Sequence, residues 1–105
     1  MMWDGWKKLT DTENNKSYEL LLAVDIENSK VMVSLMAVLA QTKSEPPTWK
    51  AEIFAFNPGA GDYPLYENVF SNLAEAEKQA WEQAQKIAQT YRPPKTLSNS
   101  TSHSQ

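Results

Sequence analysis

The sequence predicts a small α+β domain in which an antiparallel sheet of three to four strands carries one C-terminal helix packed on one face. Apolar side chains over residues 17–26, 31–40 and 48–56 alternate or run continuously, as is typical of strands. Over residues 72–91 they recur at steps of three and four, which is typical of a helix. Polar or proline-containing segments separate these elements, so the predicted order is β-β-β-(β)-α.

The chain length of 105 residues predicts a single domain over residues 1–92, followed by a polar tail over residues 93–105 that we expect to be disordered. A formal net charge of −3 provides no basic field for nucleic acid or an acidic membrane. The absence of cysteine excludes disulfides, thiolate nucleophiles and zinc sites with cysteine ligands. Because neither a signal peptide nor an apolar run long enough to cross a bilayer is seen, we expect a cytoplasmic protein.

The N-terminal segment over residues 3–9 is short and aromatic, with Trp3 and Trp6. These rings either dock on the domain or remain available to a partner, and docking is favoured because an exposed tryptophan is unfavourable in water. Residues 11–16 are polar and turn-like, so the first strand is expected to begin at residue 17.

Residues 17–26 alternate in polarity, and a polar turn over residues 27–30 leads into the apolar run over residues 31–40. The apolar face of the first strand carries Tyr18, Leu20, Leu22, Val24 and Ile26. The two segments are expected to form an antiparallel hairpin. A buried helix over residues 31–40 is the alternative, because periodicity does not settle a short apolar run, but the β-branched content favours a strand.

The segment over residues 31–40 is apolar on both faces, and the segment over residues 48–56 is so at its far end. An antiparallel sheet with one solvated face would instead show polar residues at alternate positions. One helix covers one face only, so the opposite face needs another cover. The Trp3/Trp6 segment could cover part of it, or a second copy of the chain could pack sheet on sheet. The interface candidates on that face are Met32, Met36, Val38, Phe54 and Phe56, with Leu21 as a further member.

Residues 57–64 are predicted to be a loop by their asparagine, proline and glycine content, and residues 66–70 a short additional edge strand. Tyr63 and Tyr66 lie beside this loop, where their rings either stack on a ligand or pack on the domain. The ligand-stacking candidates are therefore Trp3, Trp6, Tyr63 and Tyr66.

The C-terminal helix is expected to begin at Asn72, which together with Glu75 has the form of a capping box. Its apolar stripe is mostly alanine, which lets the helix backbone approach the sheet closely. Glu77 falls within the apolar arc, and it either extends to water from the rim or is a buried functional carboxylate. Pro93 and Pro94 end the helix, because proline cannot continue it.

No arrangement of residues indicates catalysis, a metal site or a cofactor. The single histidine, His103, lies in the expected tail, where nothing would hold it for a triad or a metal. Asp25 and Glu27 flank a turn but lack the ligand number of a calcium loop. Gly59 and Gly61 lack the other residues of a phosphate-binding loop. We therefore expect a protein that is not an enzyme and that binds no cofactor and no metal.

The order β-β-β-α, with Ala76, Glu77 and Ala80 in the last helix, resembles the double-stranded-RNA-binding domain over part of the chain. The first helix of that family is absent here. Asn72, Glu75 and Glu77 stand where the family carries the lysines that grip phosphate. The resemblance therefore implies a similar order of elements without the charge that drives binding to RNA.

Together these observations predict a small non-catalytic protein-interaction module. It would be a homodimer, or an accessory or inhibitory subunit, docked through the apolar sheet face opposite the helix. The alternative is a ligand or nucleic-acid binder that uses its exposed aromatic side chains.

Overall fold

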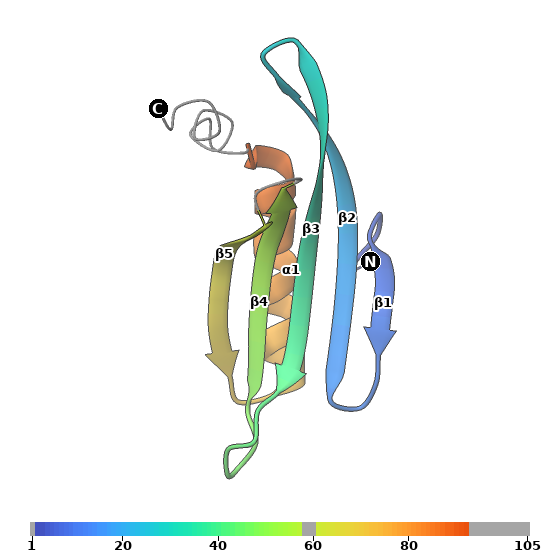
Figure 1. The fold of residues 1–105 in the computed structure, drawn as a ribbon. Coiled ribbons are helices and arrows are strands. Elements are labelled where there is room, and N and C mark those ends of the chain that lie inside the picture. Colours follow the sequence, from blue (N-terminus) through green and yellow to red (C-terminus); the bar gives the residue numbers. More distant parts are fainter. Residues whose placement is uncertain (1, 58–60, 93–105) are drawn as a thin grey trace, which may run out of the picture.

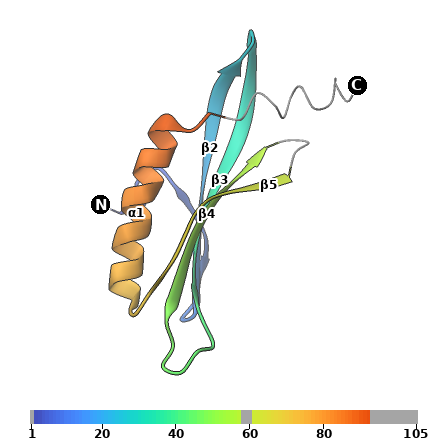
Figure 2. The ribbon, with the colours of Figure 1, turned by 90° about the vertical axis from the view of Figure 1, so that its left-hand side faces the viewer.

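The computed structural model describes residues 2–57 and 61–92, which form one antiparallel sheet and one helix (Figure 1). The elements are β1 (Lys7–Asp11), β2 (Asn15–Ile26), β3 (Ser29–Gln41), β4 (Trp49–Asn57), β5 (Gly61–Phe70) and α1 (Leu73–Thr90). The strands lie side by side in chain order, so each strand pairs with its neighbour in sequence. Figure 2 shows α1 against one face of the sheet, and no other helix or strand of the described residues lies on the opposite face. The α+β class and the C-terminal helix are thereby confirmed.

The sheet has five strands rather than the three to four that we expected, and β1 is the strand without a sequence signal. Its residues, KKLTD, are mostly exposed and do not alternate in polarity. Pairing with β2 places Lys7 opposite Glu19 and Lys8 opposite Tyr18. β1 forms because its backbone pairs with β2, and not because its own side chains are buried. The polarity pattern of the sequence therefore does not predict this strand.

β5 is longer than the short strand expected over residues 66–70, because it begins at Gly61 within the segment predicted as a loop. Pro64 lies opposite Phe54 in this strand, which forms an outer edge of the sheet. An edge strand tolerates proline, since the missing N–H can face solvent. The pairing shifts between Ile53 and Phe54, so Leu65 forms a bulge.

β2 and β3 form a long regular hairpin that pairs residue for residue from Asn15 opposite Ala40 to Ile26 opposite Ser29. Its turn consists of Glu27 and Asn28, whose φ angles of 45° and 68° are those of the turn that suits the twist of paired strands. Residues 31–40 are therefore strand, and the alternative of a buried helix over this run is wrong.

The core lies between α1 and the sheet. Alternate side chains of β3 are fully buried there, namely Val33, Leu35, Ala37 and Leu39. Ala76, Ala80 and Ala84 of α1 are equally buried, and their small size lets the helix backbone lie close to the sheet. Trp49 and Ile53 of β4 supply the larger side chains against them. Among the described residues, no helix has the length and apolarity needed to cross a membrane.

α1 begins and ends close to the expected residues. The Oδ1 atom of Asn72 accepts a hydrogen bond of 2.8 Å from the Glu75 N–H, as the capping pattern predicted. At the other end Tyr91 adopts an extended conformation, and its N–H donates to the Ile87 carbonyl at 2.7 Å. Pro93 and the expected disordered tail over residues 93–105 lie outside the described residues.

Replacing the cap tests how much the helix start stabilises the fold. Asn72→Ala is expected to lower the free energy of unfolding by about 1 kcal/mol, because it removes the acceptor for the Glu75 N–H. Ser71→Ala is the matched control, since Ser71 is an exposed neighbour outside the helix. Urea denaturation followed by circular dichroism measures both. An equal loss in the two variants would contradict the assignment of the cap to Asn72.

Candidate interaction surface

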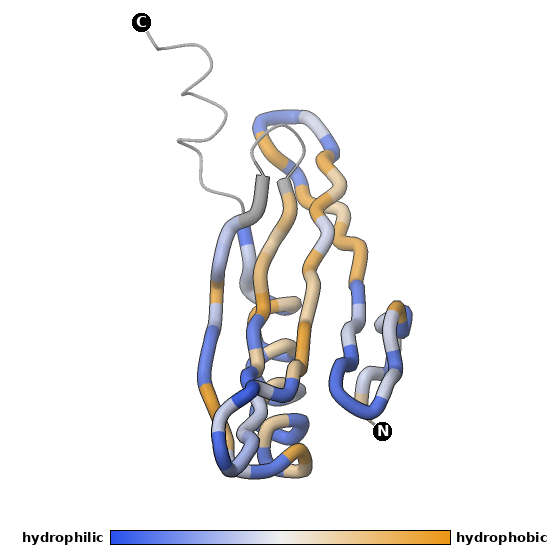
Figure 3. Tube along the Cα trace, turned by 60° about the horizontal axis from the view of Figure 1, so that its bottom comes forward, coloured by the Kyte–Doolittle hydropathy of each residue, from blue (hydrophilic) through white to orange (hydrophobic). Residues whose placement is uncertain are grey.

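The sheet face opposite α1, which we call the open face, carries a continuous group of apolar side chains. Strand pairing assembles it: Met36 lies between Glu19 and Phe54, and Ser34 lies between Leu21 and Phe56. Figure 3 shows that apolar residues run along most of β3 and β4. The apolar members of the open face are Leu21, Ala23, Met32, Met36, Val38, Ala40, Phe54, Phe56 and Val69.

Large side chains on the open face are unusually accessible. The exposed fraction is 60% for Leu21, 49% for Met32, 49% for Phe56 and 52% for Val69. Apolar side chains scattered singly over a surface need no explanation, but Leu21, Met32 and Phe56 lie close to one another on paired strands. Val69 lies apart from them, opposite Lys50. Met36, Val38 and Phe54 lie between them and are half-buried. All five sequence-predicted interface residues and Leu21 therefore share this face, and their role in binding stays a prediction.

Ion pairs border the apolar group. Lys50 lies 3.1 Å from Glu67 and 3.7 Å from Glu52, and the hydrogen bond to Glu67 is the main reason why the pKa of Lys50 is raised. At the hairpin tip Lys30 pairs with Asp25 at 3.0 Å. The two lysines offset all but one of the three negative charges, so the border of the open face presents no strong field of one sign.

One carboxylate reaches into the apolar group itself. Glu19 of β2 is half-buried, and its Oε2 atom accepts a 2.7 Å hydrogen bond from the Ser34 hydroxyl of β3. A polar group that is already hydrogen-bonded within the sheet is less unfavourable to cover than a free one. If this part of the open face were covered, the Glu19 carboxylate would therefore still have a hydrogen-bond partner.

The N-terminal aromatic segment packs on the helix side of the sheet. The Trp3 ring stacks on Tyr18 with centroids 4.2 Å apart and an angle of 5° between the rings. Trp6 meets Trp3 edge-on at 5.4 Å, and Trp81 of α1 lies 5.1 Å away. Trp3 and Trp6 therefore do not cover the open face, and the interpretation in which they cover part of it is wrong.

The four ligand-stacking candidates do not form one array. Trp3 is buried against Tyr18 beside β1, whereas Tyr63 and Tyr66 lie on β5 at the other edge of the sheet. Tyr66 packs on the core, and Tyr63 is 40% exposed. A ligand-binding role of these rings stays a prediction.

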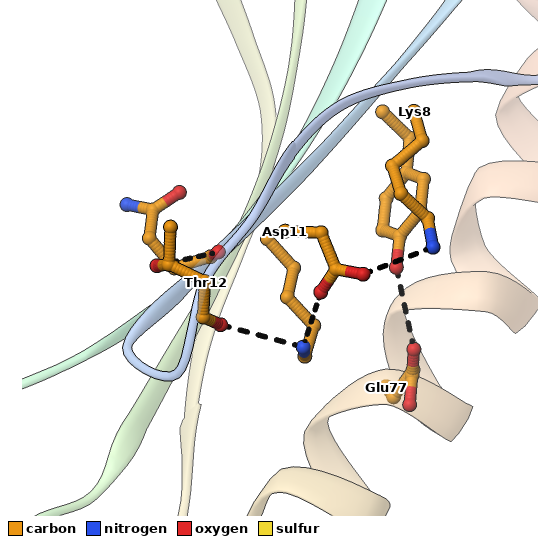
Figure 4. A network of polar contacts seen from close by, with 7 residues as sticks. Lys8, Asp11, Thr12 and Glu77 are labelled. Atoms are coloured by element: carbon orange, nitrogen blue, oxygen red, sulfur yellow. Dashed lines mark hydrogen bonds and ion pairs between the residues drawn. The ribbon is translucent and has the colours of Figure 1, made fainter.

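Glu77 extends from α1 towards the sheet, where its Oε2 atom accepts a hydrogen bond of 3.5 Å from the Tyr18 hydroxyl (Figure 4). Glu77 is half-buried, which is intermediate between the two alternatives considered for it. Burial of Tyr18, reinforced by the Glu77 carboxylate, raises the pKa of Tyr18 to about 12. Beside this pair, exposed Asp11 binds Lys16 at 2.7 Å and Lys8 at 3.1 Å, and these lysines lower its pKa.

Within residues 2–57 and 61–92 no group of histidine, cysteine, aspartate and glutamate side chains is arranged to hold a metal ion. His103 and Gly59 lie outside the described residues.

Three apolar members of the open face are not among the interface candidates predicted from the sequence: Ala23, Ala40 and Val69. The alternation within the first two long strands is the signal that places Ala23 and Ala40, whereas Val69 depends on the bulge at Leu65.

Comparison with known proteins provides no relative from which a role could be transferred. No protein-family model matches the chain, and no curated protein and no solved structure is significantly similar to it.

The Tyr18 environment predicts a loss of stability at high pH. The folded-state pKa of about 12 exceeds the ordinary value of 10.0, so the folded protein holds the phenolic proton more tightly than the unfolded chain. This contribution is present below the unfolded-state pKa and is lost as the pH rises through the folded-state pKa. Denaturation at a series of pH values should show a smaller alkaline loss for Tyr18→Phe than for the unmodified protein. If the stability of the two proteins fell equally with rising pH, the role assigned to Tyr18 would be contradicted.

Two substitutions of Trp3 distinguish the contribution of its ring packing to stability from that of its indole N–H group. Its buried Nε1 atom has no hydrogen-bond partner, so Trp3→Phe keeps an aromatic ring on Tyr18 and removes an unsatisfied donor. We expect Trp3→Phe to change the free energy of unfolding by less than about 1 kcal/mol, and Trp3→Ala to lower it by about 3 kcal/mol. Denaturation curves of both variants measure this, and equal losses would show that ring stacking contributes nothing.

Proposed function

We propose that the protein is a non-catalytic protein-interaction module that docks through its open face on a second copy of itself. Docking on a larger protein, as an accessory or inhibitory subunit, is the alternative use of the same face. The observation that carries the proposal is the asymmetry of the sheet. α1 and the N-terminal aromatic segment cover one apolar face, while the apolar group on the other has no cover among the described residues.

The size of the open face suits a protein partner. With strands about 4.8 Å apart and a rise of about 3.4 Å per residue, four strands over about eight residues span roughly 500 Å² in projection. The relief of the side chains makes the accessible area larger than this projection. Stable protein interfaces bury about 800 Å² on each partner, so the open face is of the right order.

The chemistry of the open face favours protein over nucleic acid. Binding to nucleic acid requires unpaired lysine or arginine to replace counterions along the phosphates. Here Lys50 is already held by two carboxylates, and Lys30 is held by Asp25. Methionine side chains such as Met32 and Met36 adapt to the shape of an apolar partner surface, because they are unbranched and flexible.

Sheet-on-sheet packing across a two-fold axis is the simplest way for one chain to cover this face. Two sheets pack about 10 Å apart with interdigitating side chains, and an isologous contact places the same residues on both sides. Met36 and Phe54 lie next to each other near the middle of the open face, so they would form the centre of such a contact.

Met36→Asp tests the proposal. A carboxylate at the centre of an apolar contact would be desolvated without a partner, which costs several kcal/mol and should weaken association by at least about 100-fold. Size-exclusion chromatography with light scattering gives the mass, and circular dichroism checks the fold. Gln85→Glu is the control, because it adds the same charge at an exposed position of α1.

A lower mass for Met36→Asp, with the mass of Gln85→Glu unchanged, is the expected result. A folded Met36→Asp protein with unchanged assembly would count against the open face as the surface for self-association. If the unmodified protein is a monomer, the open face is left for a different protein. Capture of a defined partner should then be lost in Met36→Asp and kept in Gln85→Glu.

A further inference from the structure

β2 extends well beyond its neighbour β1. β1 pairs only with residues Lys16 to Glu19 of β2, and within the described residues no strand pairs with the same side of β2 from Leu20 to Ile26. We call this stretch the free edge. Figure 1 shows it as the part of β2 that continues past β1 towards the hairpin turn.

The other strand of this hairpin is also only partly paired. β4 pairs with β3 from Ser34 to Gln41, so the tip of the β2–β3 hairpin is a two-stranded ribbon. A two-stranded ribbon is marginally stable in water, and it gains stability from a further strand. The free edge is therefore a place where an added strand would have a structural effect.

The backbone of the free edge is directed outwards at alternate residues. Ile26 and Ser29 close the two-residue turn as a hydrogen-bonded pair, so the even-numbered residues of β2 bond to β3. The Asn15 carbonyl, which accepts from the Thr12 N–H at 2.8 Å, confirms that odd-numbered residues face the β1 side. The N–H and C=O groups of Leu21, Ala23 and Asp25 consequently point out from the free edge.

The two outer edges of the sheet carry features that discourage pairing, and the free edge does not. β1 is short, bears Lys7 and Lys8, and is interrupted by a bulge. β5 contains Pro64 and a second bulge. Lysine, proline, bulges and short length are the means by which proteins block edge strands. The free edge, LLAVDI preceded by Leu20, contains none of them, and Leu21 is 60% exposed.

We propose that a second copy of this chain adds its own free edge antiparallel to this one, across a two-fold axis near Val24, so that the two sheets become one continuous sheet. A strand added here must be apolar on both sides, because one side meets the cluster that contains Trp6, Leu20 and Leu22 and the other extends the open face. The free edge itself meets this requirement, with Leu22 and Val24 on the helix side and Leu21 and Ala23 on the open face.

The charges and the geometry are compatible with this self-pairing. An axis at Val24 places Ala23 opposite Asp25 of the second copy, so no two carboxylates face each other directly. The overlap then ends before the level of Glu19, where Lys7 of β1 pairs, so β1 does not obstruct the added strand. The contact is isologous, as in most homodimers.

This edge contact does not depend on the proposed function, because it uses backbone groups at the rim of the sheet rather than the open face. A two-fold axis perpendicular to the sheet leaves the open faces of both copies on the same side. Edge pairing alone gives a dimer, and edge pairing together with face packing gives a tetramer. A substitution at the free edge should therefore lower the mass of the assembly whether or not the open faces pack together. A substitution on the open face should likewise lower it whether or not the free edges pair.

Ala23→Pro is the test of edge pairing. It removes an outward N–H, so it breaks no hydrogen bond to β3 while it prevents pairing with an added strand. Light scattering should show half the mass of the unmodified protein, with the circular dichroism spectrum retained. Met36→Asp should leave the edge contact in place. A folded Ala23→Pro protein of unchanged mass, or a monomeric unmodified protein, would overturn the proposal.

A single-cysteine experiment keeps the proposal testable if Ala23→Pro does not fold. The chain has no cysteine, so Val24→Cys introduces a unique thiol close to the proposed axis. Neighbouring residues of a non-hydrogen-bonded antiparallel pair have Cα atoms about 4.5 Å apart, which is within reach of a disulfide. Mild oxidation should produce a covalent dimer from Val24→Cys, and its absence would overturn the proposal. Met36→Cys is the control, because it reports face packing instead.

Discussion

A single helix can cover only one face of a sheet, and this sheet is apolar on both. The apolar side chains on both faces of β3 show this most directly. Its alternate residues Val33 and Leu35 are fully buried under α1, whereas Met32 and Met36, which flank them, face away from the helix. Burying apolar area contributes about 25 cal/mol per Å², so an uncovered face of this kind leaves favourable free energy unrealised in the isolated chain. The proposed interaction surface follows from this imbalance.

The N-terminal aromatic segment completes the covered side. α1 lies over β3, β4 and β5, which leaves the helix side of β2 to another cover. Trp3 provides it by stacking on Tyr18, although its φ of 66° lies in a left-handed region that costs about 1–2 kcal/mol for a residue with a Cβ atom. The N-terminal aromatic segment thus packs on the helix side, and it does not cover the open face.

Much of the fold could be predicted because each element carries its own periodicity. Asn72 and the alanine stripe define α1, and the period of two in the strand sequences predicts that Met36 and Phe54 share one face. β1 could not be predicted, since pairing rather than its own burial forms it. Val69 could not be placed, because the bulge at Leu65 inverts which residues of β5 face the helix. The free edge depends on where β1 stops, which the polarity pattern of β1 does not encode.

The most direct test of an occupied open face is the accessibility of its methionine methyl groups. In protein with ¹³C-labelled methionine methyls, a soluble paramagnetic probe broadens the NMR signals of accessible groups. Met2, which is 41% exposed and lies away from the sheet strands, is the internal reference. Packing of a second copy on the open face predicts that Met32 and Met36 are protected relative to Met2 at high protein concentration and become accessible on dilution. Accessibility equal to that of Met2 at every concentration would contradict self-association through the open face.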